Sequence, residues 1–309
     1  NNRQNIIFVN SFPMVFADQL KKYLFSLKMY GNKIIPILHT ETNRFTLSLS
    51  QIDANYDFCI CVFKRLVEKL KKINIPSVCI YPPFLSKENS YIPLENIKNK
   101  KILGFYGRIL PYKGVFLLVK YWEKIYKKYT DWKLKIIGNY TNWSKDYYNS
   151  IIKYINDNKL NNIIEIDNRD INGSLEKKEV FDGIDIFIQL SLYEGLPFTI
   201  LESLQYNTPV IHTNVGGVAE IKNSNLYILK FKGVYFEKFD FIDYEKEISK
   251  NLYHKYFDEN FILFEKCLDK VILENKFVNN NSDCNDMFTF STFENKIKYI
   301  LEKSTLSFI

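Results

Sequence analysis

Short apolar runs alternate with longer amphipathic segments along most of the chain. The runs are about five residues long and rich in Ile, Val and Phe, as expected for strands that are buried on both faces. The segments between them repeat apolar residues every three or four positions, as helices with one buried face do. The pattern predicts strands at 6–10, 34–38, 58–63, 77–81, 102–107, 134–138, 163–167, 184–190, 209–213 and 226–230. It predicts helices at 16–30, 63–73, 115–128, 145–158, 174–182 and 199–205.

Strands that alternate with helices indicate an α/β fold with parallel sheets covered by helices on both faces. Pro82 and Pro83 end a strand, and the polar stretch that follows predicts a linker between two domains. The predicted domains are an N-terminal domain at 1–99 with its linker at 82–100, a second α/β domain at 100–250, and a helical, Asn-rich segment at 251–309 whose last helix lies at about 292–304.

The composition is that of a globular protein. Apolar residues make up 46% of the 309 positions and charged residues 25%, which is enough for two packed domains. No apolar run approaches the ~20 residues of a membrane-spanning helix, and the N-terminus lacks the basic and apolar regions of a secretion signal. The five cysteines form no CxxC pair and are interpreted as free thiols in a reducing compartment, so a cytoplasmic location is expected. The three histidines show no metal-ligand spacing, so no metal ion is expected.

The chain is basic, with a net charge of +7. This charge suits a partner that carries phosphate, such as a nucleotide, a lipid or a nucleic acid. Most basic residues lie on predicted amphipathic helices, where they are interpreted as facing solvent. Nucleic acid is not an expected partner because no motif of nucleic-acid recognition is found. Peripheral contact with a membrane surface stays open.

Glycine is scarce, and its distribution points to one region. Only 11 residues are Gly, and nine of them lie between 104 and 217. Glycine permits positive φ angles and lets the backbone approach a ligand closely, so this cluster predicts a site in that region. Tight turns between strands and helices are the alternative explanation for part of the cluster.

The first motif is GFYGRILPYKG at 104–114. A predicted strand ends at Gly107, Arg108 follows it, and Lys113 precedes the next helix. Ligands of such sheets bind beyond the carboxyl ends of the strands, so both cations are expected there, beside a helix N-terminus. Two fixed cations and backbone N–H groups suit a diphosphate. A solvated loop with two surface cations is the alternative.

The second motif is YEGLPFTILESLQYNTPVIHTNVGGVAE at 193–220. Glu194 follows the largely apolar strand IDIFIQL, residues 195–197 make a turn, and Thr199 is expected to cap a helix that carries Glu202. Backbone N–H groups at the start of this helix suit a phosphate or a leaving group that gains charge. The carboxylate of Glu202 can accept two hydrogen bonds from a ribose. The alternatives are an exposed acid at Glu194 and an acid paired with the helix dipole at Glu202.

Residues 102–222 resemble the C-terminal half of glycosyltransferase family 4, a large group of enzymes with the GT-B fold. Glu194 and Glu202 match the family's Glu-x7-Glu element. GRILPYKG resembles its diphosphate loop, and TPVIHTNVGGVAE resembles its stretch that ends in Gly-Gly-x-x-Glu. The resemblance implies two Rossmann-like domains whose parallel sheets face a central cleft.

The resemblance also implies a role for each matching residue. Arg108 and Lys113 would hold the donor diphosphate and stabilise the leaving nucleotide. Glu194 would contact hydroxyl groups of the donor sugar, and Glu202 would hold the ribose. The loop at 168–170 would lie beside the base. Further donor-binding residues on this basis are Gly107, Gly138, Arg169, Gly195, Leu196, Pro197, Phe198 and Thr199.

The N-terminal part matches the family less fully. KIIPILHTET resembles a stretch in which a strand ends near the donor sugar, which makes His39 a candidate for hydrogen bonding to a sugar hydroxyl or a phosphate. A loop histidine without a role is the alternative. The family normally has a further stretch before this part, so the chain is interpreted as a fragment or as a form with a shortened acceptor domain. His212 stands where the family usually has a small residue, and no role is assigned to it.

The resemblance implies retaining transfer of a sugar from a UDP- or GDP-sugar to a hydroxyl of a glycan, polysaccharide or lipid-linked acceptor, with no metal ion or other cofactor. Two other classes stay open. A non-catalytic nucleotide-sugar-binding or partner subunit would bind UDP or GDP without transferring sugar, and an epimerase would use the same scaffold with other acid and base groups. A dinucleotide oxidoreductase is not expected, because no GxGxxG follows a strand.

Overall fold

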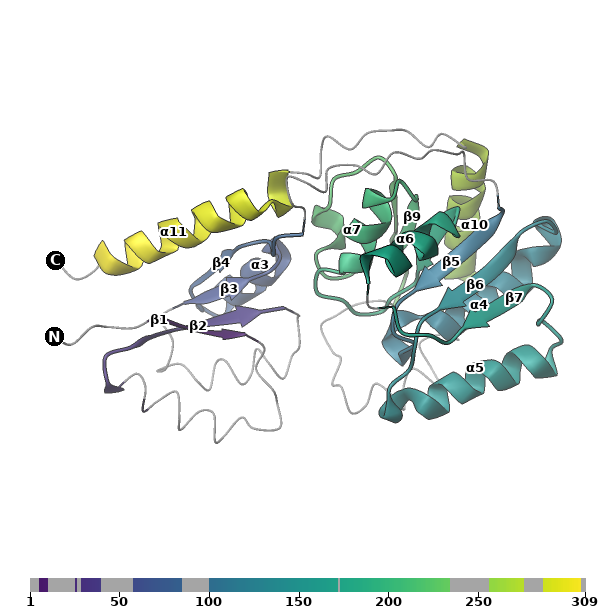
Figure 1. Ribbon diagram of the computed structural model, residues 1–309, viewed down its shortest axis with the longest axis horizontal. Coiled ribbons are helices and arrows are strands. Elements are labelled where there is room, and N and C mark those ends of the chain that lie inside the picture. Colours follow the sequence, from purple (N-terminus) through teal and green to yellow (C-terminus); the bar gives the residue numbers. More distant parts are fainter. Residues whose placement is uncertain are drawn as a thin grey trace.

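The computed structural model contains two parallel β-sheets, each covered by helices (Figure 1). Parallel neighbours in a sheet need a crossover connection, and helices between the strands are its usual form. The predicted α/β class with parallel sheets is therefore confirmed. The residues that the structure describes are 6–10, 26, 29–39, 58–84, 100–171, 173–233, 256–274 and 286–306.

Within the described residues, the N-terminal sheet has four strands and a helix on each face. Its elements are β1 (Ile6–Asn10), β2 (Lys33–Leu38), β3 (Cys59–Cys61), α3 (Lys64–Lys72), β4 (Ser77–Cys79) and α11 (Phe290–Leu306). The strand order is β1-β2-β3-β4. On one face Leu66 and Leu70 of α3 pack in a cluster with Cys59. On the other face Ile300 of α11 packs with Ile35 of β2. Successive side chains of a strand point to opposite faces, so the apolar run in β2 serves both layers.

The C-terminal sheet has six parallel strands whose order reverses once. They are β5 (Ile102–Tyr106), β6 (Lys133–Ile137), β7 (Ile164–Asp167), β8 (Ile186–Gln189), β9 (Val210–Thr213) and β10 (Leu226–Leu229). The order is β10-β9-β8-β5-β6-β7, so the chain builds outward from β5 on one side and then returns to β8 on the other. Such a reversal opens a crevice at the carboxyl ends of the two central strands, where ligands of doubly wound sheets bind.

Helices cover both faces of this sheet. They are α4 (Val115–Ile125), α5 (Lys145–Asp157), α6 (Ser174–Asp182), α7 (Phe198–Gln205) and α10 (Phe257–Glu274). Buried residues of α4, α5 and α10 share one apolar cluster, and those of α6 and α7 belong to another on the opposite face. Tyr121 of α4 lies edge-to-face with Phe257 and Phe261 of α10, at ring-centroid distances of 4.9 and 5.4 Å. These aromatic contacts fix α10 against the sheet although it is distant in sequence.

The predicted strands are all found within the described residues, although most end one or two positions before the predicted boundary. The helix predicted at 115–128 ends at Ile125 and continues as a 3-10 turn, Tyr126–Lys128. The helix predicted at 16–30 falls largely outside the described residues. The helices expected as one C-terminal segment pack on different sheets, because Phe264 of α10 belongs to the core of the C-terminal sheet and α11 covers the N-terminal one.

Thr199 is not the N-cap of α7, so that prediction is wrong. The helix begins at Phe198, and Pro197 occupies the cap position with an extended backbone and no side-chain capping bond. The hydroxyl of Thr199 instead donates to Oε1 of Gln189 at 2.9 Å. The side chain of Thr199 therefore bonds to a buried amide on β8 and does not cap the helix.

The two sheets meet through loops at the carboxyl ends of their strands. Phe63, which follows β3, lies against Gly217, which follows β9. Tyr81, which follows β4, donates a hydrogen bond from its hydroxyl to Glu220 at 2.6 Å. One buried cluster includes residues from both sheets. The crevice at the reversal of strand order therefore lies on the side of the C-terminal sheet that faces the N-terminal one.

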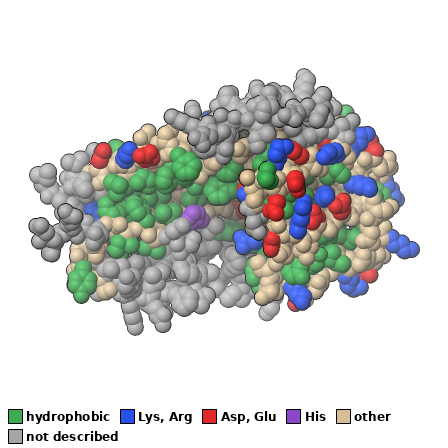
Figure 2. Space-filling model, in the orientation of Figure 1, with side chains coloured by type: hydrophobic (Ala, Val, Ile, Leu, Met, Phe, Trp, Pro, Cys, Tyr) green, Lys and Arg blue, Asp and Glu red, His purple; other side chains and the backbone are tan. Residues whose placement is uncertain are grey.

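The visible surface differs between the two halves (Figure 2). Charged side chains of both signs are interspersed over the C-terminal domain, whereas hydrophobic side chains gather over the N-terminal sheet and α11. The net charge of +7 is therefore not collected into a single basic field on this face. Among the described residues, no helix has the length and apolar character needed to cross a membrane.

Candidate functional site

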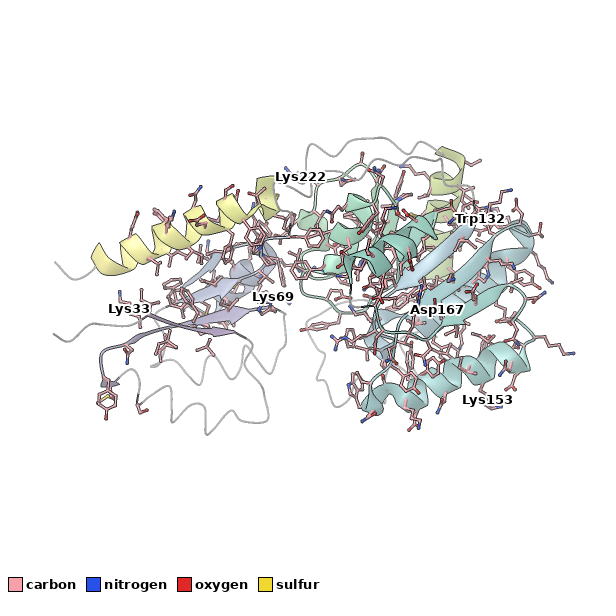
Figure 3. The ribbon with its side chains drawn as sticks, in the orientation of Figure 1. Lys33, Lys69, Trp132, Lys153, Asp167 and Lys222 are labelled. Atoms are coloured by element: carbon pink, nitrogen blue, oxygen red, sulfur yellow. The ribbon has the colours of Figure 1, made fainter. Side chains whose placement is uncertain are left out.

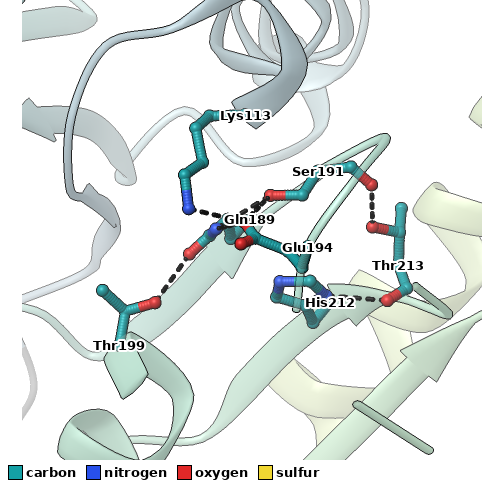
Figure 4. A network of polar contacts seen from close by, with 7 residues as sticks. All are labelled: Lys113, Gln189, Ser191, Glu194, Thr199, His212 and Thr213. Atoms are coloured by element: carbon teal, nitrogen blue, oxygen red, sulfur yellow. Dashed lines mark hydrogen bonds and ion pairs between the residues drawn. The ribbon is translucent and has the colours of Figure 1, made fainter. Parts of the chain in front are cut away.

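Glu194 is the centre of a network of polar contacts (Figure 4). Its Oε1 accepts hydrogen bonds from Gln189 Nε2 at 2.7 Å and from Ser191 Oγ at 2.8 Å, and it lies 2.6 Å from Lys113 Nζ. The side chains of Lys113 and Glu194 are 14% and 9% exposed, so their ion pair is largely buried. Because Lys113 follows β5 and Glu194 follows β8, the pair lies where the strand order reverses.

The loop after β9 holds the loop that carries Glu194. Gly216 has a φ angle of +53°, and a Cβ there would lie 2.1 Å from the carbonyl oxygen of Gly195. The N–H of Gly217 donates to that same oxygen at 2.7 Å. The hydroxyl of Thr213 donates to the carbonyl oxygen of Ser191. Backbone contacts this close leave no room for a side chain at position 216, which explains the glycine there.

Two cationic residues follow β5, Arg108 before Tyr112 in the sequence and Lys113 directly after it. Arg108 is exposed, and the ammonium of Lys113 lies 5.6 Å from the centroid of the Tyr112 ring. Burial raises the pKa of Tyr112, the charge of Glu194 raises it further, and the charge of Arg108 lowers it. Arg108, Lys113 and Glu194 therefore all act on one tyrosine. This arrangement offers positive charge at the carboxyl end of β5.

Glu202 lies in the second turn of α7 and is paired with a lysine. Its Oε1 lies 2.6 Å from Nζ of Lys177, a residue in the first turn of α6. At the start of α7, Phe198 is 43% exposed, and its ring stacks on Phe84 with centroids 5.7 Å apart. The first N–H groups of a helix have no partner within it, so the start of α7 offers donors at the same edge of the sheet.

Gly107 and Gly138 bring the ends of β5 and β6 together. Both have positive φ angles, of +141° and +138°. A Cβ on Gly138 would lie 2.1 Å from the carbonyl oxygen of Gly107, so the two loops are in backbone contact. Of the predicted donor residues, these two shape the crevice through the backbone.

Arg169 lies beyond the end of β7, two strands away from Lys113 in the sheet order. Its Nε is 2.9 Å from Oδ2 of Asp167, which is labelled in Figure 3. The neighbouring Asp170 accepts a hydrogen bond from Asn139 Nδ2 at 3.1 Å, which joins the loops after β6 and β7. The residues predicted to lie beside a base therefore lie at the carboxyl ends of the strands, on the side of β7.

The two described histidines lie in very different surroundings. His212 on β9 is fully buried, and its Nδ1 donates to the carbonyl oxygen of Thr213 at 2.7 Å. Its Nε2 has no hydrogen-bond partner among the described residues. Burial lowers the pKa of His212 to about 4, against the opposing effect of the Glu194 charge. His39 follows β2 of the other sheet and is exposed to solvent on part of its surface, and burial of the rest of the side chain lowers its pKa.

The profile of the family described as Glycosyl transferases group 1 matches residues 86–262, which is more than half of the chain. The chain belongs to this family. The match covers β5 to β10 and part of α10, and therefore the whole Glu194 network and the Glu202–Lys177 pair.

Two relatives show how far the likeness extends. An uncharacterized glycosyltransferase of Haemophilus influenzae is 29% identical over 147 residues, which are 48% of this chain and 38% of that protein. A trehalose synthase of Thermococcus litoralis is 24% identical over an alignment of 260 positions. This alignment covers 72% of this chain and 58% of that protein. The chain thus spans roughly half the length of the curated relatives that it matches.

A solved structure shows the fold. The crystal structure of Anabaena HepE in complex with UDP matches this chain with a TM-score of 0.70 at 13% sequence identity. The match covers 97% of this chain and 79% of HepE. The predicted GT-B fold of the group 1 glycosyltransferases, with parallel sheets in two Rossmann-like domains, is confirmed.

The structure of this group 1 glycosyltransferase chain also contains site residues that the motifs missed. Gln189 is fully buried and bonds to Ser191, Glu194 and Thr199, which makes it the hub beneath the predicted carboxylate. A glutamine that ends an apolar strand was an available signal, because buried polar groups need partners. Lys177 gave no such signal, since its contact with Glu202 joins two helices 25 positions apart.

Proposed function

We propose that this protein is a retaining glycosyltransferase that moves a sugar from a UDP- or GDP-sugar to a hydroxyl group of a glycan, polysaccharide or lipid-linked acceptor. The observation that carries the proposal is the buried Lys113–Glu194 pair at the reversal of strand order, with Glu202 at the same edge of the sheet. Membership of the glycosyltransferase family and the UDP in the related HepE structure support a nucleotide-sugar donor.

In the proposed complex the donor lies along the carboxyl ends of β5 and β8. Arg108 and Lys113 bind the diphosphate, Glu194 accepts hydrogen bonds from hydroxyl groups of the sugar, and Glu202 does the same for the ribose. The start of α7 adds backbone N–H groups. The base lies toward the loop of Arg169, where the contacts of Asp167 and Asn139 support a fixed rim.

The proposed transfer replaces one bond at the anomeric carbon by another on the same face. The bond from this carbon to the diphosphate oxygen breaks while the acceptor oxygen attacks, and the proton of the acceptor hydroxyl passes to the leaving phosphate. Negative charge grows on that phosphate in the transition state. Arg108, Lys113 and the N-terminus of α7 are positioned to stabilise this charge.

We propose that the reaction needs no metal ion, because these two cations supply the positive charge that a diphosphate leaving group requires. The described residues contain no group of three or more His, Cys, Asp or Glu side chains placed to hold a metal ion. The direct check is to assay transfer in the presence of a chelator.

The test of the proposed site combines binding and transfer. Calorimetry of the parent against UDP, GDP and their sugar conjugates identifies the base and the sugar. Arg108→Ala and Glu202→Ala are expected to weaken nucleotide binding roughly tenfold to a hundredfold, since hydrogen bonds to charged groups contribute ~1.5–3 kcal/mol. Both variants should also transfer sugar more slowly in the presence of EDTA than the parent does.

Lys153→Ala is a matched control, because this lysine is exposed on α5 and its ion pair within the described part of the chain is with Asp157 on the same helix. It removes one positive charge from the same domain and should bind like the parent. Unchanged binding by both Arg108→Ala and Glu202→Ala would falsify the assignment of the site. A parent that binds nucleotides but neither transfers nor hydrolyses a donor sugar would instead indicate a binding subunit.

A further inference from the structure

Lys177 contacts the carboxylate of Glu202 although it belongs to no recognised motif. Its Nζ lies 2.6 Å from Glu202 Oε1. The side chains of Lys177 and Glu202 are 32% and 12% exposed, so the pair is sheltered but open on the lysine side. A pair of this kind is held more firmly than one on the open surface.

The fold places this lysine at the edge of the sheet where a ligand would lie. α6 begins at Ser174, shortly after the carboxyl end of β7, and Lys177 is in its first turn. Lys178, the next residue along the helix, pairs with Asp182 on α6 itself and is 46% exposed. Lys177 makes its ion pair across to Glu202 of α7, whereas the ion pair of Lys178 with Asp182 stays on α6.

The surroundings of Glu202 are rich in negative charge. Burial, then Glu202 and Glu176, raise the pKa of the Tyr106 hydroxyl at the end of β5 to about 12. The pKa of Tyr206 is raised by burial and by the charges of Asp182 and Glu202, and it is lowered by Lys177 and Lys178. Lys177 thus offsets a cluster of acids while touching one of them directly.

We propose that Lys177 is a positioning residue of the donor site, which holds one oxygen of Glu202 so that the carboxylate faces the ribose hydroxyls. The inference rests on the proposed function. An ammonium on Oε1 restricts rotation of the carboxylate and leaves Oε2 available to accept from a ribose. A glutamate fixed before the nucleotide binds loses less side-chain freedom when it does, which favours binding.

The test uses nucleotides with and without ribose hydroxyls. Lys177→Met keeps the length of the side chain and a good helix former but removes the ammonium. It is expected to weaken the binding of UDP roughly threefold to tenfold, as the loss of one ordinary hydrogen bond does. 2′,3′-Dideoxy-UDP has no ribose hydroxyl groups that could donate hydrogen bonds to Glu202, so it should bind the parent more weakly. The same substitution should leave its dissociation constant unchanged. Calorimetry measures both dissociation constants.

Further variants test whether the effect depends on the contact between Lys177 and Glu202. Lys178→Met removes the same charge one residue away and should bind both nucleotides like the parent. Lys177→Arg keeps a cation within reach of Glu202 and should recover most of the affinity for UDP. In a Glu202→Gln background, Lys177→Met should cause little further loss. Lys177→Gln replaces Lys177→Met if circular dichroism shows that the latter is misfolded.

The outcomes separate the inference from the function on which it rests. Equal losses for UDP and 2′,3′-dideoxy-UDP would mean that Lys177 acts on the phosphates by its charge, and the positioning role would be wrong. Binding of UDP by Lys177→Met and Lys177→Gln that equals the parent's would also overturn it. A parent chain that binds neither UDP nor GDP would remove the proposed function, and the role of Lys177 with it.

Discussion

Lys113 and Glu194 are assigned to different parts of a donor, yet they bind each other at 2.6 Å. A diphosphate that takes the ammonium of Lys113 must share it with Glu194 or displace it. The carboxylate would then be freed to accept hydrogen bonds from the sugar. In the proposed donor complex, binding of the diphosphate would therefore be coupled to release of the Glu194 carboxylate through this one buried ion pair.

Glu194→Gln tests this coupling. The amide keeps the shape of the side chain but no longer attracts Lys113 as an anion. UDP is therefore expected to bind about threefold to tenfold more tightly, because the amide oxygen still accepts an ordinary hydrogen bond from Lys113 and only the charged part of the interaction is lost. Transfer from a UDP-sugar should be slower than in the parent, because the sugar loses its anionic acceptor. Glu165→Gln is the control, since Glu165 pairs with Lys135 at a more exposed position of the same sheet. Weaker UDP binding by Glu194→Gln would contradict the coupling.

The motifs predicted that both carboxylates and both cations lie at one edge of the sheet, because the segments that follow parallel strands meet there. The roles of these residues toward a donor stay predictions. Their partners were not predicted. The contact of Gln189 with Glu194 depends on the path of a short loop, and that of Lys177 with Glu202 on the packing of two helices. Local sequence pattern carries no information about such side-chain geometry. The local sequence pattern also did not predict that His212 is buried beside the network.

At the scale of elements, α3 begins without a cap of its own. Phe63 at its cap position provides no side-chain bond, and its first turn contains no acidic residue. Glu220 of the C-terminal domain supplies the missing acceptor. Its two carboxylate oxygens accept from the N–H groups of Lys64 at 2.8 Å and Arg65 at 2.9 Å. A helix of one domain is therefore capped by a side chain of the other.

Glu220→Ala is expected to lower the free energy of unfolding by about 2 kcal/mol, because it removes a helix cap together with the acceptor for Tyr81. Urea denaturation measures this loss, and hydrogen exchange at the amides of Lys64 and Arg65 should become faster. Glu68→Ala is the control, since Glu68 is exposed on the same helix and its loss should change stability little. Equal stabilities of the two variants would show that the cap contributes nothing.

The alternation of apolar runs predicted the elements well because strands buried on both faces and amphipathic helices differ in period. It could not predict that α10 and α11 pack on different sheets, since both read simply as amphipathic helices. The cap of α3 was missed for a similar reason. Its acceptor lies 156 positions away from Lys64 and is brought there only by the meeting of the two domains.

For the whole molecule, the loops that build the site also build the junction between the domains. Gly217 donates to the carbonyl oxygen of Gly195, next to Glu194, and on its other side it faces the buried Phe63 of the N-terminal domain. Its φ angle of −87° is one that any residue adopts, so the backbone does not require glycine there. What excludes a side chain is the closeness of the other domain.

Gly217→Ala tests this junction. An added Cβ would lie 2.7 Å from Phe63 Cβ, closer than real Cβ contacts come, and 3.1 Å from Leu196 Cδ1, which is tighter than most of them. We expect a loss of roughly 1–3 kcal/mol in the free energy of unfolding, as for other overpacked sites. Because Phe63 immediately precedes α3, the amides of Lys64 and Arg65 should also lose protection from hydrogen exchange, while those of α5 keep theirs. A substitution in the C-terminal domain would then change hydrogen exchange in the N-terminal domain.

Gly173→Ala is the matched control for this variant. At that position the nearest atom to an added Cβ is a carboxylate oxygen of Glu176, 3.7 Å away, so alanine fits without displacing anything. Gly173 is the N-cap of α6, where alanine is less favourable than glycine, so we expect a small loss of stability, of roughly 0.5 kcal/mol, and no change in the exchange of the α3 amides. If Gly217→Ala behaves in the same way, the packing between the two domains at Gly217 is loose enough to accept a side chain. If it loses stability and the α3 amides alone exchange faster, the absence of a side chain at Gly217 is what allows the two domains to pack together beside the loop of Glu194.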